Sequence, residues 1–323
     1  MTPGRYQREI SAATALTAVL VLVSLRAPAF FSAANLRDLA VNNAPALVVA
    51  AGMTLVILVG EIDISVGSQF AVCSVLCGWL VREGVSLAAM APLVLVAGML
   101  MGALNGVLIA AAGLPSIIVT LAMLVAWRDA LRWVTGGAWI QGLPVSFQWF
   151  GMSQSAAQRV IILTSLGVVG GLSWGMRYLH AGRSLYAVGS NAGAARLAGL
   201  NPARVKVAVF VLMGGFVAAA AMLNAVRFSS VPSNAGAGIE LKVIAAAVVG
   251  GTAITGGRGN VAGTLLGMTL LSVIGNALSF MGVNAFWERA IQGLIILAAL
   301  GADHLLARWP LRAPRARARV HAG

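Results

Sequence analysis

The segment LVGEIDISVGSQF, residues 58–70, places two carboxylates among glycines and serines, between two strongly apolar runs. Glycine readily interrupts a helix, and Asp and Ser are preferred residues at helix N-termini. The segment therefore predicts that one apolar helix ends near Gly60 and that a second helix begins a few residues later. Asp63 or Ser65 is expected to cap the second helix, and this helix-break role is favoured over direct contact with a ligand.

The apolar runs beside this segment belong to a pattern that covers the chain. Of its 323 residues, 59% are apolar and only 10% are charged, which is typical of a polytopic membrane protein. The net charge of +13 raises the possibility of nucleic-acid binding. The basic residues, however, lie in short gaps between apolar runs or in the C-terminal tail, which favours membrane orientation and gives no nucleic-acid partner.

A bilayer core requires about 20 residues per spanning helix. Apolar runs of about this length predict an all-α membrane protein with about ten spans in a single transmembrane domain, 1–323. The predicted spans are 9–26, 40–60, 66–81, 86–112, 115–134, 159–179, 205–227, 239–256, 261–282 and 286–307. The first run resembles a secretory signal because APA follows it, but Arg26 beside that site favours a retained helix.

Basic residues in short loops predict the orientation of the chain in the membrane. One basic group surrounds the gap after the sixth run, and a second fills the tail, 308–323. Both groups are therefore expected on the cytoplasmic side, and an even number of spans places the N-terminus there as well.

The sequence has no phosphate-binding loop of the form G-x-x-x-x-G-K-[ST]. The glycine-rich segment GGTAITGGRGN, residues 250–260, contains no lysine and is expected to form a tight helix break with positive φ angles. No catalytic residue, metal site or bound cofactor is predicted. If the protein moves a solute uphill across the membrane, the energy must therefore come from an ion gradient or from a separate ATPase.

Three segments resemble the signatures of one family, the ribose-type permeases, which are the membrane subunits of bacterial ABC importers for monosaccharides. They are GEIDISVGS (60–68), AGRSLYAVGSNAGAARLAGLNPARVKVAVF (181–210) and VVGGTAITGGRGNVAGTLLG (248–267). One departure is visible, because many family members carry a second glycine and a leucine where this chain has Glu61 and Ile64.

The resemblance implies a helical permease of the bacterial inner membrane that works by alternating access. It also implies partners: ABC ATPase subunits that bind the ATP, a periplasmic sugar-binding protein, and a second permease copy or a homologous permease. The sugars transported within the family include ribose, rhamnose, xylose, galactose and an autoinducer-like sugar. The alternatives are a nucleoside permease of the same family and a gradient-driven secondary transporter.

The segment 180–204 is expected to form a cytoplasmic coupling loop, in which a short helix over 192–197 begins at a Ser190 or Asn191 cap and ends at Gly199. Its arginines are expected to meet acids of the ATPase, and the alternative is that they only orient the chain. The coupling residues are Arg183, Gly189, Asn191, Arg196, Gly199, Pro202 and Arg204. The helix-break or gating residues are Gly60, Glu61, Asp63, Ser65, Gly67, Gly256, Gly257, Arg258 and Gly259. Glu61 is hypothesised to pair with a base such as Arg258 if the two breaks are adjacent.

Three further patterns leave their roles open. Glycine stripes at 98, 102, 106 and at 167, 171, 175 predict close helix packing. WRDALRW, residues 127–133, is either a docking site for the binding protein or a membrane-anchored helix end. Amides within the spans either line a sugar path or form interhelical hydrogen bonds; they are Asn42, Asn43, Asn105, Asn276 and Gln292.

Overall fold

The computed structural model describes residues 7–282 together with 287, 290, 293, 294 and 297. The described chain is helical, and its one extended pairing is an isolated bridge between Ile140 and Val231. The helices are α1 (Gln7–Arg26), η1 (Pro28–Phe31), α2 (Ala33–Leu58), α3 (Val66–Arg82), α4 (Leu87–Ala110), α5 (Ser116–Thr135), η2 (Gln148–Gly151), α6 (Gln154–Tyr178), α7 (His180–Ser190), α8 (Ala192–Leu197), α9 (Pro202–Ala225), α10 (Ile239–Val249) and α11 (Val261–Phe280). The predicted all-α membrane fold is confirmed.

The first nine predicted spans correspond to α1–α6 and α9–α11. The tenth, 286–307, lies mostly outside the described residues, and the basic tail lies wholly outside them. By length and composition, the described helices able to cross a membrane are α2, α4, α6, α9 and α11, while α3 and the apolar part of α1 are shorter. The span predicted over 239–256 is too long, because α10 ends at Val249, before two consecutive glycines.

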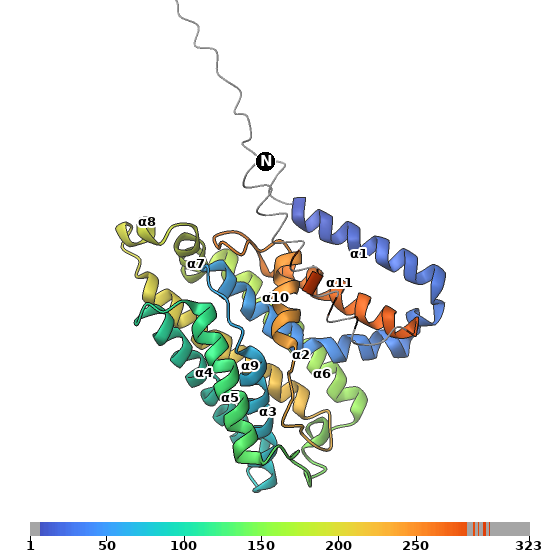
Figure 1. Ribbon diagram of the computed structural model, residues 1–323. Helices are drawn as coiled ribbons and strands as arrows, with labels where there is room; N and C mark the ends of the chain where they lie inside the picture. Colours follow the sequence, from blue (N-terminus) through green and yellow to red (C-terminus); the bar gives the residue numbers. More distant parts are fainter. Residues whose placement is uncertain (1–6, 283–286, 288–289, 291–292, 295–296, 298–323) are drawn as a thin grey trace, which may run out of the picture.

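The centre of the bundle is α2 (Figure 1), which packs against α9 on one side and against α6, α10 and α11 on others. Its second half is buried on every face, and residues such as Val48 and Val49 are fully buried. A helix that is apolar all round belongs in the interior of a bundle. The helix begins earlier than the predicted residue 40, because the side chain of Ser32 caps it by accepting the backbone N–H of Asn35.

The tightest helix pair is α4 with α9, and the glycine stripe of α4 explains it. A Cβ atom added at Gly98 would overlap the carbonyl oxygen of Gly214, and one at Gly102 would overlap that of Phe210. Such close approach of two backbones is possible only where side chains are absent. The predicted packing role of this stripe is confirmed.

The equivalent prediction for α6 is wrong within the described chain. Cβ atoms added at Gly167 or Gly171 would have no described atom within 4 Å, and one at Gly175 would meet only Leu179 of the same segment. These glycines lie on an outer face of α6, because the neighbouring helices approach it from other directions.

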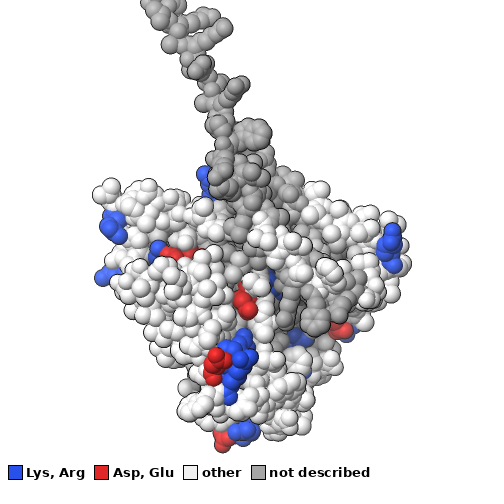
Figure 2. Space-filling view, in the orientation of Figure 1, with Lys and Arg blue, Asp and Glu red and all other residues white. Residues whose placement is uncertain are grey.

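Charge is sparse on the visible face of the molecule (Figure 2), where a few small groups of Lys, Arg, Asp and Glu side chains, several with both signs side by side, are separated by wide uncharged areas. This surface suits a lipid environment. The two cysteines, Cys73 and Cys77, are buried in α3 and form no disulfide, so they act as small apolar packing residues.

Candidate functional site

The three segments that carry the family resemblance meet at one point. The backbone N–H of Gly257 donates a 2.9 Å hydrogen bond to the carbonyl oxygen of Leu58, at the end of α2. A Cβ atom at Gly189 would overlap that same carbonyl oxygen, and one at Gly256 would lie 2.9 Å from the nitrogen of Gly60. These five residues are called the glycine junction below. It joins the ends of α2 and α7 to the turn after α10, and α7, α8 and that turn lie at the same end of the bundle (Figure 1).

Glycine is required in the junction for backbone conformation as well as for space. Gly60, Gly256, Gly257 and Gly259 have φ angles of +80°, +85°, +72° and +141°, which other residues rarely adopt. The predicted helix break after α10 is therefore confirmed in its backbone geometry. Tyr186 of α7 also holds the turn after α10, because its hydroxyl donates a 2.8 Å hydrogen bond to the carbonyl oxygen of Gly259.

The coupling segment folds as its sequence predicts. The side chain of Asn191 accepts a 2.9 Å hydrogen bond from the N–H of Ala194 and begins α8, which spans the expected residues 192–197. Gly199, with φ of +83°, ends the helix, and Pro202 is the first residue of α9. Of the two capping residues considered, Asn191 is the one used.

The arginines of this segment lie on the surface. Arg183, Arg196 and Arg204 are exposed, and no described acid forms an ion pair with them. They therefore remain available to acids of another protein, although the structure does not bring them together into one cluster.

Asp63 is the most deeply buried charged residue of the segment 58–70. It is fully buried, and its Oδ1 accepts hydrogen bonds from the backbone N–H and the hydroxyl of Ser65, at 2.9 and 2.6 Å. Asp63 therefore holds Ser65, the residue directly before α3, but neither side chain accepts a hydrogen bond from the first backbone N–H groups of that helix. The predicted cap at Asp63 or Ser65 is wrong, because both hydrogen bonds to Asp63 Oδ1 come from Ser65 itself. Instead, the Ser65 hydroxyl accepts from Gln69 and Asn105, at 2.7 and 2.8 Å.

Burial raises the pKa of Asp63 above its ordinary value, and hydrogen bonds from Ser65, Asn105 and Gln69 oppose that increase. Asp63 lies in the break between α2 and α3, and it forms no ion pair with a base in the described part of the chain. Asp63 holds Ser65 directly before α3, and Ser65 ties that position to α4 through Asn105.

Glu61 pairs with Lys206 of α9, and the hypothesised pairing with Arg258 is wrong. The two breaks are adjacent, as that hypothesis required, but the side chain of Arg258 is exposed. Lys206 was not among the predicted site residues. The signal that was available is its position in the second turn of the helix that begins at Pro202, directly after the coupling segment.

Next to this ion pair lies an open cleft of about 360 Å³. One wall is formed by the end of α4 and the turn to α5, residues 109–115, and the other by α8 and the start of α9. Three charged side chains line the cleft, those of Glu61, Arg196 and Lys206. The cleft thus separates α8 and the start of α9 from the turn between α4 and α5.

Gly67 lies in the first turn of α3, where it allows the segment before α10 to come close. A Cβ atom at Gly67 would overlap the carboxylate of Glu240 and lie 2.8 Å from the carbonyl oxygen of Gly236. Arg128 of α5 reaches the same segment and donates a 3.0 Å hydrogen bond to the carbonyl oxygen of Ala235.

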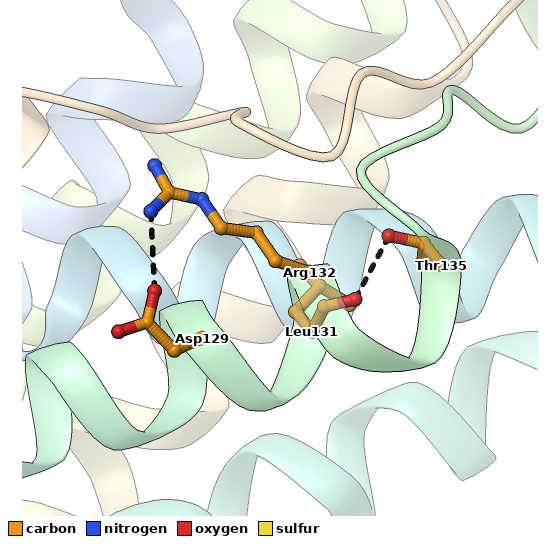
Figure 3. Close-up of polar contacts among 4 residues, drawn as sticks. All are labelled: Asp129, Leu131, Arg132 and Thr135. Atoms are coloured by element: carbon orange, nitrogen blue, oxygen red, sulfur yellow. Dashed lines mark hydrogen bonds and ion pairs between the residues drawn. The ribbon is translucent and has the colours of Figure 1, made fainter.

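The remaining charges of WRDALRW lie on the surface of α5. Arg132 and Asp129 are both exposed and form a 3.1 Å ion pair (Figure 3). Thr135, at the end of the helix, donates to the carbonyl oxygen of Leu131 at 2.8 Å (Figure 3). Because Arg128 is engaged within the bundle and the other two charges neutralise each other, the geometry favours a helix end over a charged docking site.

The amides within the spans form interhelical hydrogen bonds. Asn43 accepts from Lys242 at 2.9 Å and from Ser272 at 2.7 Å, and Asn276 accepts from Asn35 at 3.1 Å. The remaining pairs are Asn42 with Arg227 and Asn105 with Ser65. Gln292 lies outside the described residues.

Comparison with known proteins shows the family to which the chain belongs. The family model described as branched-chain amino acid transport system / permease component matches residues 35–300, which include all three quoted segments. The autoinducer 2 import system permease protein LsrC of Escherichia coli K12 is 34% identical over 92% of this chain and 86% of its own length. The same protein of Enterobacter sp. strain 638 is 35% identical over 96% and 90%.

A relative named for a second sugar matches equally well. The ribose import permease protein RbsC of Escherichia coli K12 is 32% identical over 90% of this chain and 92% of its own length. No solved structure matches the chain. This protein therefore belongs to the family of importer permeases that includes the autoinducer 2 and ribose import permeases, as its three signature segments predict.

Proposed function

We propose that this protein is the permease subunit of an ATP-driven ABC importer for a monosaccharide or a sugar-like autoinducer, in a bacterial inner membrane. The observation that carries the proposal is the similarity to permeases named for autoinducer 2 and for ribose over nine-tenths or more of the chain. The matched residues 35–300 include the glycine junction and the coupling segment.

ATP would be bound by separate ABC ATPase subunits rather than by this chain. The short, capped helix α8 and the exposed Arg196 and Arg204 support docking of those subunits at this end of the bundle. That end, together with both chain termini, would face the cytoplasm. A periplasmic sugar-binding protein would deliver the sugar from the other side, and a second permease copy or a homologous permease would complete the assembly.

The geometry supports alternating access through the two helix breaks. The glycine junction holds the end of α2 against α7 and against the turn after α10. The helices that follow the two breaks along the chain are α3 and α11. A displacement of the coupling segment would therefore act on both breaks at once, which is the movement that a permease needs to change the side to which it opens.

The test is uptake into liposomes that contain the purified chain together with the ATPase and binding protein encoded next to it. Radiolabelled D-ribose, autoinducer 2 and uridine serve as separate probes. We expect uptake of one of the sugars that requires ATP inside the liposomes and the binding protein outside, and none with an ATPase variant unable to hydrolyse ATP. Uptake of uridine alone would instead indicate a nucleoside permease. Uptake by the chain alone under an ion gradient would overturn the proposal.

A further inference from the structure

Glu61 and Lys206 form an ion pair that joins the segment after α2 to the second turn of α9. The Glu61 side chain is 12% exposed and that of Lys206 is 26% exposed. Both groups are therefore largely withdrawn from water, and removal of either one leaves the other charge poorly solvated. A pair of this kind constrains its two segments more strongly than an exposed pair would.

Glu61 is firmly attached to α2. Its backbone N–H donates a 3.1 Å hydrogen bond to the carbonyl oxygen of Val56, across the left-handed Gly60. This is a standard way of closing a helix C-terminus. Asp63 follows two residues later and accepts hydrogen bonds from Ser65, the residue directly before α3. A force on the Glu61 carboxylate therefore acts on the end of α2 and on the start of α3.

Lys206 is attached equally closely to the coupling segment. Residues 198–201 connect α8 to α9, and hydrogen bonds close both ends of this connection. The N–H of Leu200 donates to the carbonyl oxygen of Ala195 at 3.0 Å, and the side chain of Asn201 accepts from the N–H of Arg204 at 3.1 Å. A displacement of α8 is therefore passed to the first turns of α9.

The cleft beside the pair gives these two segments room to move. It separates α8 and the start of α9 from residues 109–115, and the other charged side chain that lines it is Arg196 of α8. The pair thus lies where the coupling segment meets the bundle across unfilled space. The glycine junction is a separate contact, because it is made by α7 and not by α8 or α9.

We propose that the Glu61–Lys206 ion pair is the positioning contact through which movement of α8 reaches the break between α2 and α3. Lys206 draws Glu61 with it when α8 is displaced, and the start of α3 follows. The inference rests on the proposed function, since it assigns a path by which ATPase movement acts on the permease.

The experiment uses the complete transporter in liposomes and measures sugar uptake and ATP hydrolysis together, with D-ribose and autoinducer 2 as the probes. In Glu61→Gln and Lys206→Gln, we expect uptake per ATP hydrolysed to fall by at least about fivefold while hydrolysis continues. The charge-reversed double variant, Glu61→Lys with Lys206→Glu, should restore most of that ratio. The matched control is Glu83→Gln, which removes one partner of the exposed 3.3 Å pair between Arg82 and Glu83 at the other end of α3 and should keep the wild-type ratio.

The outcomes separate this inference from the proposed function. Absence of ATP-dependent uptake of both probes by the wild-type complex would remove the proposed function, and this inference with it. If the wild type transports but both single variants keep its ratio, the inference alone is wrong. It is equally wrong if the reversed pair shows no recovery. Size-exclusion profiles and melting temperatures identify a variant that fails to fold. If a single variant fails in this way, the ratio of uptake to ATP hydrolysed in the charge-reversed double variant decides the result.

Discussion

The carbonyl oxygen of Leu58 accepts a 2.9 Å hydrogen bond from the backbone nitrogen of Gly257, so the end of α2 is bonded to the turn after α10. Gly189 of α7 lies directly against the same carbonyl. Contacts between backbones cannot adjust by side-chain rotation. Movement of any of the three segments must therefore carry the others along or break the contact.

The space at Gly189 gives the first prediction. In Gly189→Ala, the added methyl group would overlap the carbonyl oxygen of Leu58, and overpacking of this kind typically costs about 1–3 kcal/mol. We expect a lower melting temperature of the purified chain in detergent. The control is Gly167→Ala, also in a helix but with no described atom near the added methyl group, which should be neutral or stabilising by up to about 1 kcal/mol. Equal melting temperatures for the two variants would contradict the close contact.

The second prediction concerns Asp63 and pH. Its pKa is raised in the folded protein above the ordinary value of 3.8, so the folded state holds this proton more tightly than the unfolded chain does. The stability that Asp63 contributes is therefore complete below pH 3.8 and is lost as pH rises through the folded-state pKa. Asp63→Asn keeps an oxygen for the Ser65 bonds and removes the charge.

We therefore expect the melting temperature of Asp63→Asn, relative to the wild type, to rise as the pH goes from acidic to neutral. Asp63→Ala also lacks the charge but loses the two hydrogen bonds from Ser65, each worth about 0.5–1.5 kcal/mol, so it should be less stable than Asp63→Asn at every pH. Thermal unfolding of the three proteins over this pH range is the measurement. A pH-independent difference between Asp63→Asn and the wild type would show that the carboxylate does not titrate as argued.

The glycine stripe of α4 gives a third prediction. Gly102→Ala places a methyl group against the carbonyl oxygen of Phe210 and should force α4 and α9 apart. Gly171→Ala in α6 is matched in residue type and helical setting, but no described atom lies within 4 Å of the added methyl group. The first variant should lose folded protein on mild heating in detergent, and the second should behave as the wild type. If Gly171→Ala were the more damaging change, the assignment of the two stripes would be reversed.

The two stripes also show what the sequence can and cannot predict. Helix ends depend on neighbouring residues, so the cap at Asn191, the end at Gly199 and the start at Pro202 were predictable from local pattern. Glycine spacing is the same in α4 and α6, but which face meets a neighbour depends on how the helices assemble. The partner of Glu61 was missed for the same reason, because Lys206 lies 145 residues away in the chain.

The last prediction concerns the hydroxyl groups of Thr54 in α2 and Thr264 in α11, which are buried and 2.7 Å apart. Each hydroxyl has one hydrogen, so one of them donates to the other. Each also lies within hydrogen-bond distance of a carbonyl of its own segment, to which it can donate when the other hydroxyl is removed. Thr54→Val and Thr264→Val should each destabilise the fold, and the double variant should lose less than the sum, because the shared bond is lost only once. The expected coupling is about 0.6–2 kcal/mol, the range for hydrogen bonds between membrane helices. Unfolding of all four proteins in one detergent gives the cycle, and strictly additive losses would mean that the two hydroxyls do not bond each other.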